Sequence, residues 1–277
     1  MYNYHTHTNW CDGKSTADDI VKKAISLNYK AIGFSGHAPT SLCAKWQMSK
    51  EGFVEYKQKI RELQKQYVAE IEIYLGVEAD FIPNIAGASN FKNDKLDYII
   101  GSVHYVESNI FQQQFLTIDA SPEVFEKGVR SLFNSNVENA VKTYFEAIRQ
   151  MLQVEKPNII GHLDLVKKFN KNNCYFNEND NWYKAEIEKT IEIVKESQCL
   201  IEINTRGYYK KLTEEFYPST YILNLCKEHR IPIVVNSDTH HVDELSKGRQ
   251  EVFELLKKIG ITSHTVLCKN NWIEIDI

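Results

Sequence analysis

Short apolar segments alternate with longer amphipathic segments along almost the whole chain, and this alternation constrains the fold more than any other feature. Apolar runs of strand length predict strands at residues 2–5, 31–35, 71–77, 98–102, 159–161, 200–203, 233–235 and 265–268. Helical periodicity predicts helices at residues 16–27, 50–68, 136–153, 182–197, 219–229 and 248–259. This regular alternation favours a parallel sheet, either closed as a barrel or open and doubly wound.

The loop after the first expected strand favours the barrel. Thr6-His7-Thr8-Asn9-Trp10 stands where a dinucleotide-binding fold would carry a glycine-rich turn. In a parallel barrel, the catalytic residues lie at the carboxyl ends of the strands and in the loops that follow. Candidate ligands occupy those positions here. We therefore predict an α/β fold in which residues 1–277 form a single TIM-like barrel domain.

Composition narrows the class of partner. The 277 residues are 43% hydrophobic and 25% charged, with a net charge of −4, as in an ordinary soluble globular protein. This charge gives no reason to expect nucleic acid or a membrane surface as partner. No signal-type segment precedes His5, and no apolar run approaches the roughly 20 residues that span a bilayer. The six cysteines are scattered without a CxxC pair, which predicts free thiols in a cytoplasmic protein.

His5 and His7 stand two residues apart in the first expected strand. In an extended strand, residues two apart point to the same face, so both imidazoles can reach one point in space. Imidazole and carboxylate groups hold zinc, iron and manganese, and a site for several ions needs a bridging carboxylate such as Glu78. Asp12 follows in the loop after the first strand, and further candidates follow the later strands, namely His37, Asp80, His104, His162, Asp238, His240 and His241. The sequence therefore predicts a metallo-hydrolase.

The prediction of a metal site depends on the number of histidines that lie at one end of the expected sheet. A single histidine after a strand is more often a structural hydrogen-bonding residue, and an isolated carboxylate there commonly caps the next helix. Here, however, seven of the nine histidines lie at an expected strand end or just beyond it. The other two have structural interpretations: His229 lies in a last helical turn, where a cation suits the helix dipole, and His264 lies in a polar turn.

The series HTHT, SGH, GVE, GSVH, GHLD and SDTH resembles the polymerase and histidinol phosphatase (PHP) family of metal-dependent phosphoesterases, in the order of that family. Length and the GVE, GSVH and GHLD contexts are most similar to its stand-alone histidinol-phosphate phosphatases. The resemblance implies a distorted (β/α)7 barrel with a site for three divalent ions of zinc, iron or manganese. It also implies hydrolysis of L-histidinol phosphate to L-histidinol and phosphate, a step of histidine biosynthesis.

The same resemblance implies a set of ligands for each ion. One ion would be held by His5, His7, Glu78 and Asp238, and Glu78 would bridge to a second ion held by His104 and His162. The third ion would be held by Asp12, His37 and His240. Many family members carry a histidine where this chain has Asp12. A carboxylate is a harder ligand, so this third position favours iron or manganese over zinc, or binds its ion more weakly.

Charge determines the remaining catalytic roles. Two ions bridged by Glu78 can share a water molecule and lower its pKa from 15.7 toward about 7. An arginine would complete the phosphate clamp, because its planar fork matches phosphate geometry. Arg206, which follows the sixth expected strand, is the better candidate, and Arg249 is the second. The general acid is expected to be Asp238 or His241.

A selective pocket for histidinol phosphate should offer carboxylates and an aromatic wall to the ammonium and imidazole groups of the substrate. Residues 105–126 are a candidate lid, with Tyr105, Glu107, Phe115 or Asp119 as contacts, and Trp46 in the loop 38–48 is another candidate wall. Solvated loop charges and ordinary core aromatics are the competing interpretations. Lys167-Lys168 and Lys210-Lys211 are interpreted as surface pairs.

Three other functions stay open at this point. The chain could hydrolyse another small phosphate ester or a nucleotide, although no basic stripe with interleaved aromatics is visible for single strands. It could be a non-catalytic metal-binding module, or a redox enzyme that uses iron at the same site. Phosphatase turnover that chelator abolishes and metal restores would separate hydrolysis from the last two. The sequence does not indicate an oligomeric state.

Overall fold

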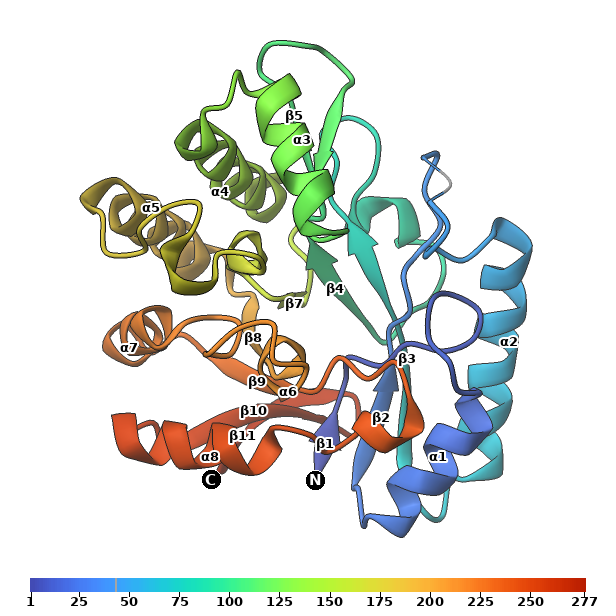
Figure 1. The fold of residues 1–277 in the computed structure, drawn as a ribbon. Helices are drawn as coiled ribbons and strands as arrows, with labels where there is room; N and C mark the ends of the chain where they lie inside the picture. Colours follow the sequence, from blue (N-terminus) through green and yellow to red (C-terminus); the bar gives the residue numbers. More distant parts are fainter. Residues whose placement is uncertain (43) are drawn as a thin grey trace.

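The computed structural model describes residues 1–42 and 44–277, and its main feature is a seven-stranded parallel sheet that curves into a nearly closed barrel (Figure 1). In sheet order the strands are β1 (Tyr2–Asn3), β2 (Ala31–Phe34), β3 (Glu72–Asp80), β4 (Tyr98–Ser102), β7 (Ile159–Ile160), β8 (Leu200–Asn204) and β9 (Ile233–Asn236). A parallel bridge between Thr6 and Thr239 joins the two edges, and the His7 N–H donates to the Thr239 carbonyl at 2.8 Å. The predicted barrel is confirmed.

The described residues form eight α-helices, most of which cover the outside of the barrel, while one short helix directly follows β8 at the carboxyl ends of the strands (Figure 1). They are α1 (Ala17–Ser26), α2 (Lys50–Gln66), α3 (Pro122–Leu132), α4 (Val137–Val154), α5 (Asn181–Ser197), α6 (Arg206–Tyr209), α7 (Thr220–His229) and α8 (Arg249–Ile259), with short 3-10 turns at η1 (Ala88–Phe91), η2 (Leu165–Lys167), η3 (Lys171–Asn173) and η4 (Val242–Glu244). The six predicted helices all form, with ends within two residues of those expected. Capping explains this agreement, because side chains of Thr16, Ser49, Asn136 and Ser219 accept the N–H three residues on.

Alternation along β3 shows how the sequence fills both faces of the sheet. Ile73, Leu75 and Val77 point outward and pack in the cluster that includes α1 and α2. Tyr74 and Glu78 lie on the other face, inside the barrel, because side chains of a strand alternate. Gly76 lies between them on that face, where a Cβ would meet the Tyr98 ring at 2.5 Å. Inside the barrel, the strand therefore presents the aromatic ring of Tyr74 near its amino end and the carboxylate of Glu78 near its carboxyl end.

Two hairpins and two helices, α3 and α6, differ from the expected elements. The segment 263–268 is a strand, β10 (Ser263–Cys268), but it pairs antiparallel with β11 (Asn271–Asp276) outside the barrel sheet. His264 is therefore in a strand and buried, so its interpretation as a turn residue is wrong. The expected lid holds a second hairpin, β5 (Tyr105–Glu107) with β6 (Phe115–Thr117), and the start of α3.

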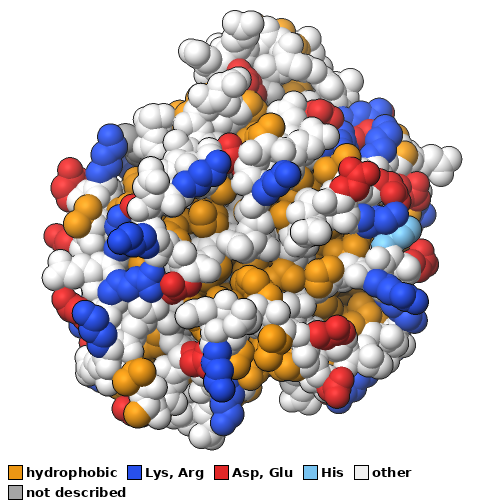
Figure 2. Space-filling model, turned by 180° about the vertical axis from the view of Figure 1, so that it is seen from behind, with side chains coloured by type: hydrophobic (Ala, Val, Ile, Leu, Met, Phe, Trp, Pro, Cys, Tyr) orange, Lys and Arg blue, Asp and Glu red, His pale blue; other side chains and the backbone are white. Residues whose placement is uncertain are grey.

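The outer surface mixes side-chain types. The face in Figure 2 has apolar side chains across its centre, and its Lys and Arg side chains are interspersed with acidic ones. Within the described part of the chain, no helix combines the length and the apolar character that a membrane crossing needs.

Candidate metal centre

The predicted ligands come together at the carboxyl ends of the barrel strands. They lie at the ends of six different strands or in the loops that follow, and they are His5, His7, Asp12, His37, Glu78, His104, His162, Asp238 and His240. All of them are buried or partly buried except Asp12, which is exposed. Three overlapping groups of three or four of these residues bring their ligand atoms within 4.8 Å of one another. Their convergence agrees with the expected positions, and their roles as ligands stay a prediction.

Glu78 lies at the middle of the cluster. Its carboxylate is surrounded by five imidazoles, with Oε2 at 3.2 Å from His5 Nε2, 3.4 Å from His7 Nε2 and 3.1 Å from His37 Nδ1, and Oε1 at 2.9 Å from His162 Nε2 and 3.6 Å from His104 Nε2. The Ser102 hydroxyl donates to Oε1 at 2.7 Å. Because its two oxygens face different histidines, the carboxylate has the geometry of a bridging ligand.

Orphaned buried atoms test whether the cluster fits metal ions. Nε2 of His5, Nε2 of His7 and Oδ1 of Asp238 are buried and have no hydrogen-bond partner among the described residues. The three residues also form one of the compact groups. Buried polar atoms are normally satisfied, so three unsatisfied atoms that face one another fit a bound cation. The donor set of imidazole and carboxylate fits divalent metal ions.

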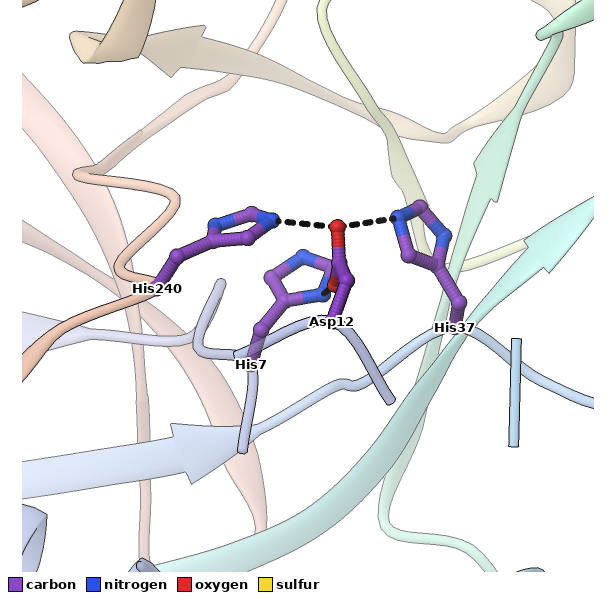
Figure 3. Close-up of side chains that lie close together, drawn as sticks. All are labelled: His7, Asp12, His37 and His240. Atoms are coloured by element: carbon purple, nitrogen blue, oxygen red, sulfur yellow. Dashed lines mark hydrogen bonds and ion pairs between the residues drawn. The ribbon is translucent and has the colours of Figure 1, made fainter. Parts of the chain in front are cut away.

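Figure 3 shows the outermost group, which is formed by His7, Asp12, His37 and His240. Asp12 Oδ2 lies 3.1 Å from His240 Nε2 and 4.0 Å from His37 Nε2, and Asp12 Oδ1 lies 3.3 Å from His7 Nδ1. The Asp12 side chain is 33% exposed, whereas the His7 side chain is fully buried. This group is therefore the part of the cluster that opens most toward solvent.

Two carboxylates beneath the cluster orient its histidines. Asp80 was among the candidates expected at the strand ends, whereas Glu202 was not predicted. Glu202 on β8 is fully buried and its Oε1 lies 2.6 Å from His5 Nδ1. Asp80 at the end of β3 contacts His104 Nδ1 in the same way. Each contact leaves Nε2 of the ring facing Glu78, as a ligand held by a carboxylate requires. The sequence signal that could have identified Glu202 is a single glutamate between the apolar residues of β8.

Opposed electrostatic effects set the protonation of these groups. Burial alone would lower the pKa of His104, but the Asp80 and Glu78 carboxylates raise it to about 10. For His37, burial prevails over the Glu78 carboxylate and lowers the pKa to about 4. Burial would raise the pKa of Glu78 and of Asp238, yet neighbouring histidines, with His37 first for Glu78 and His5 first for Asp238, hold both well below the usual range. Both carboxyls are therefore anionic.

A pocket of about 250 Å³ opens above the cluster. Besides the ligands, its lining includes Trp46, Asp119, Lys168 and Arg206. Trp46 stacks on Tyr105, with ring centroids 5.8 Å apart and an interplanar angle of 20°. The Lys168 ammonium donates to the Asp119 carbonyl at 2.7 Å and lies 3.6 Å from Oδ2 of the same residue. The candidate arginine, the candidate wall residue Trp46 and the lid carboxylate Asp119 thus border a single space, which Tyr105, Glu107 and Phe115 do not line.

Arg206 is held in place by the loop after β9. Its Nη1 donates to the Asp238 carbonyl at 3.1 Å and lies 3.3 Å from Glu244 Oε2. Glu244 also accepts the backbone N–H of His240 at 3.0 Å and pairs with Lys210. One carboxylate therefore ties the arginine, a candidate ligand and the loop together, and Lys210 is not a free surface charge.

Two candidates and one interpretation need correction. The His241 side chain is 44% exposed and accepts the Asp243 N–H at 3.3 Å, away from the pocket lining. Arg249 donates to the Tyr2 carbonyl at the start of β1, at 2.9 Å, and lines a different pocket. Neither is assigned to the reaction any longer. Lys167 is buried in an ion cluster with Asp164 at 3.1 Å, so it is not a solvated surface residue.

Comparison with known proteins places the chain in a family. Residues 3–206 match the PHP domain. A probable histidinol-phosphatase from Schizosaccharomyces pombe is 27% identical over 276 residues, with 94% of this chain and 87% of that protein covered. The matched range holds seven of the nine candidate ligands, and Asp238 and His240 follow it.

Solved structures have the same architecture. A candidate histidinol phosphatase from Listeria monocytogenes superposes with a TM-score of 0.81 at 25% identity, covering 91% of this chain and 99% of that one. The histidinol phosphate phosphatase from Lactococcus lactis, complexed with zinc, L-histidinol and phosphate, superposes with a TM-score of 0.69 at 20% identity, covering 98% of both chains. The domain match, which takes in most of the sequence, and the shared barrel lead to one conclusion: the chain belongs to the PHP domain family.

Proposed function

We propose that this chain is a metal-dependent phosphomonoesterase that hydrolyses L-histidinol phosphate in histidine biosynthesis. The observation that carries the proposal is the convergence of the nine candidate ligands beneath one small pocket that also offers Arg206, Lys168 and Asp119. The names of the relatives from Schizosaccharomyces pombe and Listeria monocytogenes support the same reaction. A biosynthetic role and the free thiols of the described cysteines agree with a cytoplasmic enzyme.

We assign three divalent ions to the cluster, with zinc, iron or manganese as the candidates. Such ions supply a water of lowered pKa and neutralise phosphoryl oxygens when they are bound. His5, His7 and Asp238 would hold one ion, and His104 and His162 a second, with Glu78 between them. Asp12, His37 and His240 would hold the third. The low pKa of Asp238 suits a ligand better than a proton donor.

Arg206 and Lys168 supply the positive charge that the protein itself offers to the phosphoryl group. Both line the pocket together with the ligands. The Arg206 guanidinium keeps its position through Glu244 and the Asp238 carbonyl, so binding a phosphate oxygen costs little ordering of the side chain. A planar guanidinium can hold two oxygens of the phosphoryl group at once.

Asp119 and Trp46 are proposed to recognise the cationic end of the substrate. Burial would raise the pKa of Asp119, but His104 and Lys168 lower it, so this carboxyl is anionic and can pair with an ammonium group. Trp46 offers a flat ring to the imidazole and is backed by Tyr105, which does not line the pocket itself. The substrate would thus lie with its phosphate over the ions and its amine beside Asp119.

The test is phosphate release from L-histidinol phosphate, compared with glycerol phosphate, a nucleoside monophosphate and a short single-stranded oligonucleotide. We expect a kcat/KM for histidinol phosphate at least about 100-fold above the others, which corresponds to roughly 2.7 kcal/mol of transition-state binding. Equal turnover of all esters would retain a phosphatase but overturn the substrate. Absence of turnover with zinc, iron and manganese alike would overturn the enzymatic function.

Two variants make the assay specific to the site. Asp238→Asn keeps the size of the side chain and removes the charge of a candidate ligand, so activity should be lost. Asp243→Asn is the matched control, because that carboxylate lies in the same loop but its side chain is 67% exposed and outside the pocket lining. Chelator should abolish turnover, and added metal should restore it.

A further inference from the structure

A second pocket, of about 580 Å³, lies between α8 and the hairpin β10–β11. Its lining includes Arg249, Phe253, Lys257, His264, Ile275 and Asp276, and it shares no lining residue with the pocket above the metal centre. We call it the α8 pocket. Nothing in the proposed reaction uses it.

The cations of the α8 pocket are not neutralised. Among the described residues, no carboxylate oxygen lies within 4.0 Å of the charged nitrogens of Arg249 or Lys257. The partner of Arg249 is a neutral group, the Tyr2 carbonyl, and its guanidinium lies 4.7 Å from the centre of the Phe253 ring. Asp276, the acidic side chain of the lining, forms no ion pair with either cation. The pocket therefore has donors and positive charge to offer to a ligand.

His264 adds an unused buried donor or acceptor. The residue is 4% exposed, and its Nδ1 has no hydrogen-bond partner among the described residues. Its ring meets Phe253 edge-on at 5.3 Å, so Phe253 contacts both the imidazole and the Arg249 guanidinium. Burial, and then the charge of Arg249, lower the pKa of His264 to about 4. Buried polar atoms of native proteins are normally satisfied by protein groups, ordered water or an ion, so this nitrogen is a position that a bound molecule could complete.

We infer that the α8 pocket binds a small organic anion, with Arg249 and Lys257 contacting the charged group and Phe253 and Ile275 contacting an apolar body. A guanidinium that is fixed by a carbonyl and a ring is preorganised for an oxyanion, because its fork holds two oxygens. Carboxylate and phosphoryl groups share this chemistry. This inference does not depend on the proposed function, since it uses no residue of the metal centre.

The test is calorimetric titration of the metal-loaded full-length protein with benzoate and, separately, with phenylphosphonate, which a phosphatase cannot hydrolyse. Lys257→Glu is the main variant, because Lys257 is exposed and its replacement leaves the core intact. Lys258→Glu is its matched control, being the next residue of α8 and outside the pocket lining. Arg249→Gln is the second variant, with thermal unfolding measured to detect any loss of the contact with Tyr2.

We expect Lys257→Glu and Arg249→Gln each to weaken the binding of at least one probe by about tenfold or more, and Lys258→Glu to leave it within about twofold. A response confined to benzoate assigns the pocket to carboxylates, and a response confined to phenylphosphonate assigns it to phosphoryl compounds. Either response supports the inference. If neither probe responds to Lys257→Glu or to folded Arg249→Gln, all measured binding belongs to the metal centre and the inference is overturned.

Discussion

The barrel interior has an upper half, at the carboxyl ends of the strands, and a lower half, at their amino ends. The two halves are built from the same strands and satisfy their polar atoms in opposite ways. In the lower half, Tyr4, Tyr74 and Tyr98 pack with aliphatic residues. The Tyr4 hydroxyl donates to the Leu267 carbonyl at 2.8 Å, and the Tyr98 hydroxyl donates to the Tyr4 carbonyl. In the upper half, imidazole and carboxylate groups are equally buried, yet several of their atoms have no partner.

This difference separates stability from function along each strand. Burial of aromatic side chains with satisfied hydroxyls stabilises the fold, whereas burial of unpaired polar atoms costs free energy until a ligand completes them. The lower half can therefore hold the strand ends in place while the upper half keeps open coordination positions. Variants placed at different heights on the same strands test this division.

The largest effect is expected from Glu78→Gln. The substitution removes the charge that faces five histidines, so kcat/KM should fall at least about 10,000-fold, or more than about 5 kcal/mol, with loss of bound metal. Steady-state kinetics measure kcat/KM, and metal analysis measures the amount of bound metal. Glu72→Gln is the control on the same strand, since Glu72 contacts Tyr74 and the Lys269 N–H at the lower end. Equal losses in both variants would contradict the division.

Tyr98→Ala, in the lower half, should lower the stability of the fold and leave the activity per bound metal unchanged. The ring is buried among Tyr4, Gly33 and Gly76, so its removal leaves a cavity and should lower the free energy of unfolding by about 3–5 kcal/mol. Tyr98→Phe should cost only about 1 kcal/mol, because a single hydrogen bond is lost. Denaturant unfolding measures both. In the fraction of Tyr98→Ala that folds, kcat per bound metal should match that of the unmodified protein.

His264, which lies on the hairpin outside the barrel sheet, should make the stability of the fold depend on pH. Burial and Arg249 lower the pKa of His264 to about 4, against about 6.5 for an unfolded chain. Between these values the unfolded state binds the proton more readily, so the stability that neutral His264 contributes is present above pH 6.5 and lost as the pH falls toward 4. The stability difference between the unmodified protein and His264→Gln should therefore shrink by at most about 3 kcal/mol from pH 7 to pH 4. A difference independent of pH would contradict this assignment.

Glu202 lies between the two halves and should affect metal binding without affecting substrate contacts. Its oxygens hold His5 Nδ1 at 2.6 Å and the His162 N–H at 2.9 Å. Glu202→Gln should weaken metal affinity about 10- to 100-fold, because the orientation and basicity of the His5 ring are lost. Competition with a chelator measures this affinity. The matched control is Glu186→Gln on α5, which breaks a buried pair with Arg149 at 2.8 Å but should leave metal affinity unchanged.

The smallest effect concerns selectivity at the mouth of the pocket. Asp119→Asn should raise KM for histidinol phosphate about tenfold and leave KM for phenyl phosphate, which has no cation, within about twofold. Glu123→Gln, an exposed change at the start of α3, is the control. Equal changes for both esters would assign Asp119 to the support of Lys168 rather than to the substrate.

Local patterns determined much of this protein from its sequence alone. The strands around the barrel and six helices were predictable, because apolar runs, helical periodicity and capping residues act within a few neighbours. The candidate ligands were predictable for the same reason, since each one follows a strand and parallel strands end at the same edge. The hairpin β5–β6 was missed because three-residue strands are too short to show alternation. The start of α3 was missed although Ser121 and Pro122 signal it.

Only the tertiary structure decided which long-range partners each side chain meets. His241 and Arg249 satisfied the sequence pattern, but chain direction turns one outward and carries the other to the start of β1. Glu202 was hidden in an apolar strand, and only the closed barrel brings it to His5, 197 residues away. A sequence encodes period and local capping directly, whereas the partner of a buried charge depends on how distant strands are brought together.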